Sequence, residues 1–365
     1  MEKDRFPGVR IVVRAALLLL VSGACMWPFM KPRETAGPST EPVGLHAFAG
    51  ETMGTTYSVK VFAAPEAWSG LSERVGPAIQ AALDLVNDRM STYRPDSELS
   101  RFNQLQDTAP FSMSRDTLAV FEVAQRVSEV SGGAFDVTIG PLVNAWGFGP
   151  GERTVTGPSE DELAALRGRV GYRKLELDAA ASTVRKTQPD LYCDLSAVAK
   201  GYGVDRVVKA LEDLGIASYM VEVGGEVRTR GLKAGRPWRI AIAKPVPDQQ
   251  AHDRIFPMPP EGLALATSGD YRNFYELDGI RLSHTIDPST GRPITHNLAS
   301  VSVFHANCAD ADAYATAFMV LGPEKGYDLA VQEDVAALFI TRDAPDRFSE
   351  KTTPAFEAQF GKEAE

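Results

Sequence analysis

The sequence has few of the residues on which metal clusters and disulfide frameworks depend. Its 365 residues include three cysteines and five histidines. Apart from Cys25 near the N-terminus, the cysteines are Cys193 and Cys308, whose spacing matches neither a disulfide framework nor a metal motif. An oxidising compartment would allow one disulfide between them. We expect instead that both are buried free thiols.

The sequence also lacks an excess of positive charge. It contains 38 Lys and Arg against 48 Asp and Glu, which gives a formal net charge of -10. No stripe of basic residues occurs along the chain, so the electrostatic footprint of a nucleic-acid-binding protein is missing. We therefore expect no nucleic-acid partner.

The apolar run near the N-terminus is too short to span a bilayer comfortably. It covers residues 15–21, follows three arginines and precedes the small residues before Cys25. This pattern predicts an export signal over residues 1–25, of the lipoprotein type in which Cys25 is lipidated. An ordinary cleaved signal or a membrane anchor is the alternative. Residues 26–43 are rich in proline and small polar residues and are predicted to be a tether, with the folded domain over residues 44–365.

No internal repeat and no regular alternation of strands and helices is present. Period-two patterns predict strands at residues 57–61 and 299–303. Helical spacing of apolar residues predicts helices over residues 72–90 and 114–131, the second with Ser114 as its N-cap. This irregular order favours an α+β fold over a doubly wound parallel sheet.

One apolar helix carries two polar residues that packing does not require. The helix is expected to begin near Asp310 and to end at Gly322. Asp312 and Thr316 are four residues apart and share a face, and a carboxylate in such a helix requires a partner. Two interpretations stay open. Both side chains bind a hard cation, or Asp312 is a first-turn acid stabilised by the helix dipole while Thr316 bonds a carbonyl.

Three further positions have both a functional and a structural interpretation. Asp194 precedes SAVAKGYG, a small-residue turn at a helix N-terminus where phosphate binds readily, although Asp194 also suits a helix N-cap. The Gly132-Gly133 pair begins a ligand loop or caps a helix. His284 lies in a strand pattern, where it is either a catalyst or a hydrogen-bonded neighbour. Taken jointly, a cation held by Asp312, Thr316 and a carbonyl near Ala197 would leave positions open for the phosphates of a nucleotide.

Eight motifs in order closely resemble the ApbE family, the FAD:protein FMN transferases. They cover roughly residues 45 to 345, nearly the whole chain after the tether. The motifs are TMGTTY, MSTYRPDSELSRFN, GGAFDVTIGPLVNAWGFGP, DLSAVAKGYGVD, VEVGGEVRTRG, TSGDYRNFYELDG, SHTIDPSTGRPI and ADAYATAFMVLGPEKG.

The resemblance implies a two-lobed α+β catalytic domain with FAD in the cleft, and it assigns residues by position. FAD contacts are implied at Met53, Tyr93, Ala134, Phe135, Asp136, Asp194, Lys200 and Ile286. Mg²⁺ ligands are implied at Asp312, Thr316 and the carbonyl of Ala197. His284 is the implied base or phosphate stabiliser, with Asp194 in reserve.

The implied reaction is Mg²⁺-dependent transfer of FMN from FAD to a Thr or Ser hydroxyl of another protein, with release of AMP. The implied acceptors carry a pattern similar to D-x-x-T-G-x-T and belong to sodium-pumping NADH:quinone reductase or related redox complexes. The implied location is the periplasmic side of a bacterial envelope, on a membrane through Cys25. An FAD pyrophosphatase that gives FMN and AMP, or a non-catalytic FAD-binding lipoprotein, is the alternative.

The resemblance predicts the behaviour of a His284→Ala variant. We expect it to retain FAD, because the ring is assigned to proton or phosphate chemistry and not to flavin binding, and to lose transfer. The check is FAD binding by equilibrium titration beside intact-mass analysis of an acceptor. Normal transfer by the variant would remove His284 from the mechanism.

Overall fold

The computed structural model of the protein describes residues 44–149, 157–243, 245, 252–270, 274–277, 280–344 and 347–361. The predicted export signal, the predicted tether and the lipidation of Cys25 lie outside these residues. Within the part of the chain that is described, no helix has both the length and the hydropathy needed to cross a membrane.

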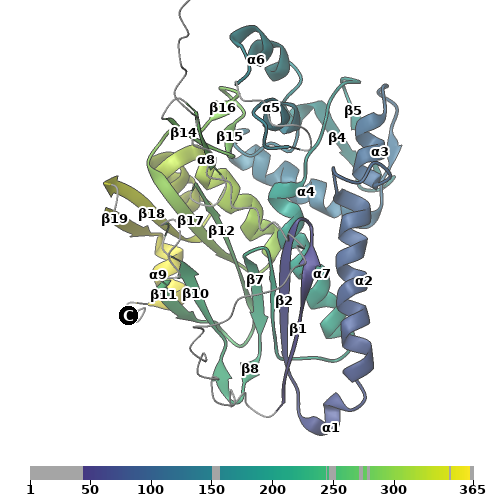
Figure 1. The fold of residues 1–365 in the computed structure, drawn as a ribbon, viewed down its shortest axis with the longest axis vertical. Coiled ribbons are helices and arrows are strands. Elements are labelled where there is room, and N and C mark those ends of the chain that lie inside the picture. Colours follow the sequence, from purple (N-terminus) through teal and green to yellow (C-terminus); the bar gives the residue numbers. More distant parts are fainter. Residues whose placement is uncertain are drawn as a thin grey trace, which may run out of the picture.

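An eight-stranded sheet forms the centre of the molecule (Figure 1). Its strands follow one another in chain order, and each is antiparallel to its neighbours. From one edge to the other they are β1 (Leu45–Thr52), β2 (Thr55–Phe62), β6 (Tyr219–Val223), β7 (Glu226–Arg230), β12 (Leu263–Gly269), β17 (Leu298–His305), β18 (Ala336–Ala344) and β19 (Arg347–Thr352).

Helices cover one face of this sheet, and a hairpin with a short helix covers part of the other (Figure 1). The covering helices are α2 (Ser72–Met90), α4 (Arg115–Val130), α7 (Ser196–Asp213) and α8 (Cys308–Gln332). The opposite face carries β10 (Arg239–Ala243), β11 (His252–Pro257) and α9 (Pro354–Phe360).

The remaining elements are short and lie mostly in connections between the larger ones. The helical ones are α1 (Pro65–Trp68), α3 (Glu98–Gln104), α5 (Gly140–Ala145), α6 (Glu160–Arg167) and the 3-10 turn η1 (Tyr172–Lys174). The strands are β3 (Phe111–Ser112), β4 (Leu175–Asp178), β5 (Thr183–Lys186), β8 (Leu232–Lys233), β9 (Arg236–Pro237), β13 (Phe274–Leu277), β14 (Ile280–Ser283), β15 (Ile286–Asp287) and β16 (Arg292–Pro293).

The alternation of side chains explains how the central strands hold both layers. On β17, Val301 and Val303 pack into the cluster under the helices, while Phe304 packs into the cluster on the opposite face. Seven of its eight residues are therefore buried, as a strand covered on both sides requires. The predicted α+β class is confirmed, as are the helix over residues 72–90 and the Ser114 N-cap.

Helices α7 and α8 approach each other closely, and a glycine makes this possible. A Cβ atom at Gly201 would lie 2.3 Å from the carbonyl oxygen of Cys308, so no side chain fits at this crossing. The prediction of a small-residue turn at SAVAKGYG is wrong, because α7 begins at Ser196 and these residues form its first two turns. Their small size serves the helix contact.

Helix α8 consists of two helical segments that meet at a kink. It begins at Cys308, which places Asp312 in its second turn, so the interpretation of Asp312 as a first-turn acid is wrong. Gly322, with a φ of 82° and a ψ of -175°, is not helical, so the predicted end of the first segment is confirmed, and the second segment continues to Gln332. Pro323 has no N–H to offer the carbonyl of Met319. His296 Nε2 lies 2.9 Å from that carbonyl oxygen and takes the place of the missing donor.

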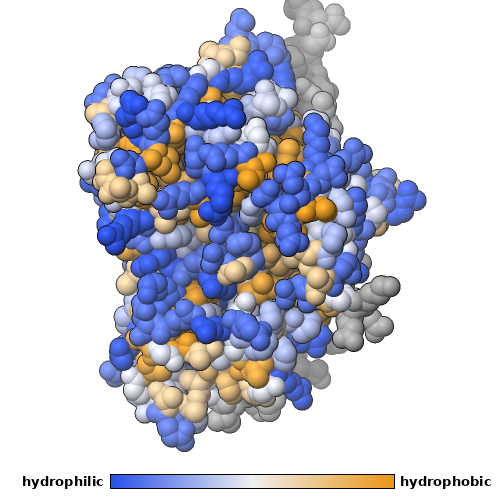
Figure 2. Space-filling view, turned by 180° about the vertical axis from the view of Figure 1, so that it is seen from behind, coloured by the Kyte–Doolittle hydropathy of each residue, from blue (hydrophilic) through white to orange (hydrophobic). Residues whose placement is uncertain are grey.

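Polar and apolar residues alternate over the face seen in Figure 2, where apolar residues gather in small groups between polar ones. The large apolar side chains that are more than a third exposed include Tyr93, Leu232, Ile255 and Val331. Tyr93 is the most exposed of these four, at 71%, so its ring is accessible to a ligand. Cys193 and Cys308 are buried free thiols, as predicted.

The kink predicts a pH dependence of stability. Neutral His296 donates from Nε2 to Met319 and accepts the Leu298 amide at Nδ1, at 3.3 Å. Burial lowers the pKa of His296 below its ordinary 6.5. The unfolded chain therefore binds more protons than the folded chain once the pH falls below about 6.5, and stability declines toward the folded-state pKa.

A His296→Leu variant should lose about 1 to 3 kcal/mol at pH 7.5, because the Met319 carbonyl is left without its donor. It should also lose less stability than the parent protein between pH 7 and pH 5. Urea unfolding at several pH values measures both effects. An unchanged pH dependence in the variant would show that His296 does not contribute to it.

Candidate active site

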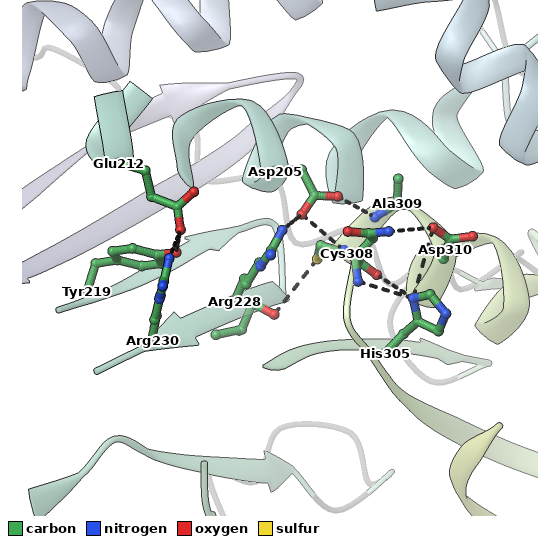
Figure 3. A network of polar contacts seen from close by, with 11 residues as sticks. Asp205, Glu212, Tyr219, Arg228, Arg230, His305, Cys308, Ala309 and Asp310 are labelled. Carbon is green, nitrogen blue, oxygen red and sulfur yellow. Dashed lines mark hydrogen bonds and ion pairs between the residues drawn. The ribbon is translucent and has the colours of Figure 1, made fainter. Parts of the chain in front are cut away.

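Three ion pairs join strand β7 to helix α7. Alternate residues of β7 point toward the helix because the side chains of a strand have a period of two. Figure 3 shows the second and third pairs. The pairs are Glu226 with Lys200 at 3.1 Å, Arg228 with Asp205 at 2.6 Å, and Arg230 with Glu212 at 2.6 Å.

The first of these pairs is shared with helix α8. Lys200 Nζ lies 3.4 Å and 3.5 Å from the two carboxylate oxygens of Asp312. The amide of Gly201 also donates to Asp312 Oδ2, at 3.0 Å. Asp312 is 3% exposed and Glu226 is 4% exposed, whereas 30% of the Lys200 side chain is exposed. The Lys200 ammonium thus pairs with two buried carboxylates, while part of the lysine side chain remains exposed.

The charges in this group shift one another's pKa values. Burial raises the pKa of Asp312, and it raises the pKa of Glu226 to about 7 against the attraction of Lys200. Burial opposes the charge of Lys200, but Asp312 and Glu226 outweigh it and raise the pKa of Lys200 above its ordinary value. Lys200 therefore remains a cation at neutral pH.

The predicted cation ligands are oxygen atoms from two helices. Thr316 lies one turn beyond Asp312 on α8, and its hydroxyl oxygen is 3.4 Å from that of Ser268 on β12. Ala197 lies one turn before Gly201 on α7, and the amide of Gly201 donates to Asp312 Oδ2 at 3.0 Å.

These donors fit a hard cation such as Mg²⁺, which prefers one or two carboxylates with neutral oxygens. In the described part of the chain, no group of three His, Cys, Asp or Glu side chains could hold a metal by itself. The predicted site depends instead on one carboxylate, one hydroxyl and one carbonyl. When both carboxylates are ionised, Asp312, Glu226 and Lys200 together carry a net charge of one negative unit, which favours a cation.

The loop after α4 is ordered by the predicted FAD contact Asp136. Its Oδ1 accepts the amide and the hydroxyl of Thr138 at 2.8 Å and 2.6 Å, and its Oδ2 accepts the amide of Tyr172 at 2.8 Å. Burial raises the pKa of Asp136, although these hydrogen bonds act against the rise. Phe135 is buried beside it and Ala134 is partly exposed. Asp136 thus shapes the loop, and Ala134 is the more accessible of its neighbours.

Asp194 adjoins this loop at the entrance to α7. Its amide donates to the carbonyl of Val137 at 2.7 Å, which holds the two segments together. Its Oδ1 accepts the amide of Ser196 at 2.8 Å. The N-cap position itself is Leu195, which has no side-chain cap. The predicted N-cap role is therefore shifted by one residue, and Asp194 binds the first amide of the helix.

Met53 is at the tip of the hairpin that joins β1 to β2, in a strained backbone conformation. It has a φ of +50°, and the next residue, Gly54, has a φ of +71°, as a type I′ turn requires. Asparagine is the usual residue at that first position, and methionine there costs about 1 kcal/mol. A Cβ at Gly203 of α7 would lie 2.8 Å from Met53 Cε, so the side chain points to α7.

A cavity of about 500 Å³ adjoins this hairpin. It is lined by Met53, by Asn87 of α2 and by Arg94, which follows Tyr93. Asn87 Nδ2 donates to Thr52 Oγ1 at 3.0 Å and fixes the hairpin against the helix. The structure thus places two predicted FAD contacts, Met53 and Tyr93, on segments that border one cavity.

His284 and Ile286 belong to the segment between β14 and β16. The His284 ring is edge-on to Phe148, with 6.3 Å between ring centroids. Ile286 is 5% exposed and packs in a small cluster with Leu142 and Trp146. Trp146 Nε1 donates to the carbonyl of Gly291 at 2.8 Å and holds the β15–β16 hairpin. Ile286 therefore positions the neighbouring His284 segment more than it offers surface to a ligand.

The structure joins Lys200 to Asp312 across two adjoining helices, with Ala197 and Thr316 about one turn away along α7 and α8. It adds Glu226 beside Lys200 and Ser268 beside Thr316, two residues that the sequence did not single out. The charged alternation of Glu226, Arg228 and Arg230 in one strand was the available signal. Such a pattern predicts a charged face turned toward another element. It does not predict which element that is.

Asp205 fixes the start of α8 from the neighbouring helix. Its two carboxylate oxygens accept the amides of Cys308 and Ala309 at 3.1 Å and 3.0 Å, and Arg228 binds it from β7 (Figure 3). The N-cap residue Asn307 makes no side-chain cap of its own. Asp205 thus substitutes for a local cap and sets the position of Asp312 one turn later.

Fold and site together define a class: an α+β protein with a partly open polar centre between two helices and the sheet. This centre combines oxygen donors suited to a hard cation with an ammonium suited to an anionic ligand. Glycine-containing loops and a strained hairpin border it.

Comparisons with known proteins identify the family. The model described as the ApbE family matches residues 53–339, and the chain belongs to this family. A curated "FAD:protein FMN transferase" of Vibrio cholerae is 46% identical over 315 residues, which are 86% of this chain and 92% of that protein. One of the same name from Escherichia coli is 38% identical over 352 residues, 96% of each chain.

Solved structures agree in fold. The flavin transferase ApbE from Vibrio cholerae superposes with a TM-score of 0.79 at 44% identity, covering 87% of this chain and 100% of that one. The apo form of the flavinyl transferase ApbE from Pseudomonas stutzeri gives a TM-score of 0.76 at 39% identity, over 87% of this chain and 97% of that one.

The capping of α8 by Asp205 generates a stability prediction. Asp205→Ala should lower the free energy of unfolding by about 2 to 4 kcal/mol, because two helix amides and Arg228 lose their acceptor. Asp213→Ala, in an exposed pair with Lys209 on the same helix, should change it by no more than about 0.5 kcal/mol. The free energy of unfolding of both variants is measured in guanidinium. Equal losses in the two variants would show that the Asp205 cap does not stabilise the fold.

Proposed function

We propose that the protein transfers FMN from FAD to a Thr or Ser hydroxyl of another protein and releases AMP. The single observation that supports this most is membership of the ApbE family at up to 46% identity to proteins named FAD:protein FMN transferases. The polar centre of Lys200, Asp312 and Thr316 supplies groups of the kinds that this reaction needs.

In the proposed reaction, the acceptor oxygen attacks the phosphorus on the riboflavin side of the FAD pyrophosphate. A new phosphoester bond forms, the bond from that phosphorus to the bridging oxygen breaks, and AMP leaves with the bond's electron pair. A bound Mg²⁺ would neutralise charge on the pyrophosphate. Asp312, Thr316 and the Ala197 carbonyl would hold it.

The chain's own residues would orient FAD and move the proton. Lys200 presents an ammonium to the phosphates, and its open side allows this contact. Met53, Tyr93, Ala134, Phe135, Asp136, Asp194 and Ile286 complete the proposed FAD site. His284 takes the proton of the acceptor hydroxyl as general base, with Asp194 as the second candidate.

The proposed acceptors carry a D-x-x-T-G-x-T-like pattern and belong to sodium-pumping NADH:quinone reductase or related redox complexes. The proposed location is the periplasmic side of a bacterial envelope, with Cys25 lipidated. The N-terminal pattern of arginines, apolar run and cysteine supports the proposed location and the proposed lipidation of Cys25.

The test is intact-mass analysis of an acceptor domain incubated with the protein, FAD and Mg²⁺. We expect a gain of one FMN that EDTA abolishes. Asp312→Ala should slow it by roughly two orders of magnitude or more, because the carboxylate that would hold the cation is lost. Asp213→Ala, an exposed carboxylate on α7, is the matched control and should transfer normally.

Two other outcomes would overturn the proposal. Release of AMP and FMN with an unlabelled acceptor would identify an FAD pyrophosphatase, in which water replaces the acceptor hydroxyl. Bound FAD with neither AMP nor labelled acceptor would identify a non-catalytic FAD-binding protein.

A further inference from the structure

The Lys200 ammonium is shared unequally between two buried carboxylates. It lies 3.1 Å from Glu226 Oε1 but 3.4 Å and 3.5 Å from the oxygens of Asp312. Charge-assisted hydrogen bonds are ordinarily about 2.7 to 2.9 Å long, so the Asp312 contacts are long. Asp312 is therefore only loosely paired with Lys200.

Glu226 is held rigidly on the other side of the ammonium. It is 4% exposed, and the next ion pair on β7, Arg228 with Asp205, fixes the strand against α7. Gly224 turns the chain into β7 with a φ of +63°, and a Cβ there would lie 3.2 Å from Lys200 Cδ. The Lys200 chain thus passes over a glycine to reach Glu226.

Glu226 also retains unused capacity. Among the described residues its Oε2 is buried and accepts no hydrogen bond, although a buried carboxylate oxygen ordinarily has a partner. The other carboxylates of the β7–α7 pairs, Asp205 and Glu212, each bind an arginine and at least one further donor. Burial of a carboxylate with one oxygen unpartnered is costly for stability alone, which favours a functional role.

The charges of this group indicate how Glu226 would affect the binding of a cation and a diphosphate. When both carboxylates are ionised, Asp312 and Glu226 contribute two negative charges and Lys200 one positive charge, so the group then has a net charge of one negative unit. A divalent cation would change this to one positive unit, which suits an anionic diphosphate. Without Glu226 the group would be neutral, and Lys200 would turn wholly to Asp312.

We propose that Glu226 is a positioning residue for Lys200. It draws the ammonium away from full contact with Asp312, so that Asp312 stays available to a hard cation. It then keeps the ammonium at the site, facing the diphosphate, once Asp312 binds that cation. This inference rests on the proposed function and extends it to a residue outside the predicted ligand set.

The experiment measures Mg²⁺ binding by calorimetry to the full-length protein, without FAD or acceptor, beside the melting temperature of each variant. Glu226→Gln removes the negative charge and keeps the length of the side chain. Glu226→Asp keeps the charge but shortens the reach by one methylene. Glu212→Gln makes the same change as the first variant on α7, 12 residues beyond Lys200 and so about 18 Å along the helix.

We expect Glu226→Gln and Glu226→Asp each to weaken Mg²⁺ binding roughly tenfold or more, as loss of a residue that orients a metal ligand does. Glu212→Gln should bind Mg²⁺ like the parent protein. Parent-like affinity in Glu226→Asp would overturn the proposal, because the charge alone would then suffice. If Glu226→Gln fails to fold, Glu226→Asp decides by itself.

A Lys200→Met background separates positioning from a purely structural role. Lys200→Met should bind Mg²⁺ more tightly, because a competing cation is gone, and Glu226→Asp should then have little further effect on affinity. An equal effect of Glu226→Asp with and without Lys200 would overturn the proposal. So would a fall in melting temperature without any change in Mg²⁺ affinity.

These results are separable from those on the proposed function. Failed transfer with the expected Mg²⁺ affinities would overturn the transferase and leave the role of Glu226 standing. A parent protein that binds no Mg²⁺ would overturn both the cation site and this inference.

Discussion

The structure depends on the close contact of α7 and α8 at Gly201. Because no side chain fits between Gly201 and the Cys308 carbonyl, the two helix backbones meet directly. The amide of Gly201 then reaches Asp312, and Asp205 reaches the first amides of α8. A larger residue at position 201 would separate the helices and with them every group of the polar centre. The packing of two backbones thus sets the geometry of the chemistry.

The sheet completes this arrangement from below the helices. Strand β7 presents three charged side chains to α7, and β12 presents Ser268 to α8. A buried polar centre is costly unless its groups satisfy one another. Here carboxylates, an ammonium and backbone amides do so, although Glu226 Oε2 and Arg228 Nε are buried without a partner among the described residues. Glu226 pairs with Lys200 of the proposed FAD site, and Met53 of that proposed site has a strained backbone with a positive φ.

Local sequence patterns predicted much of the secondary structure. Helix α2 and the start of α4 follow from apolar spacing and capping, which are local properties. The interruption of α8 also follows from local signals, because Gly322 and Pro323 ordinarily end a helix. His296, distant in sequence, supplies a donor to the Met319 carbonyl at this interruption, which no local pattern predicts. The small residues of SAVAKGYG suit a turn, but Gly201 among them is required by the contact with a neighbouring helix.

By itself the sequence determined the α+β class, the main elements, the buried thiols and, through its resemblance, the family. It also singled out Asp312, Thr316, Lys200 and Ala197, because each belongs to a motif. Only the tertiary structure decided that Glu226 and Ser268 adjoin them and that Asp205 caps α8. Those relations join residues of different elements, and the partner of a side chain across such distances is set by packing, which no local pattern encodes.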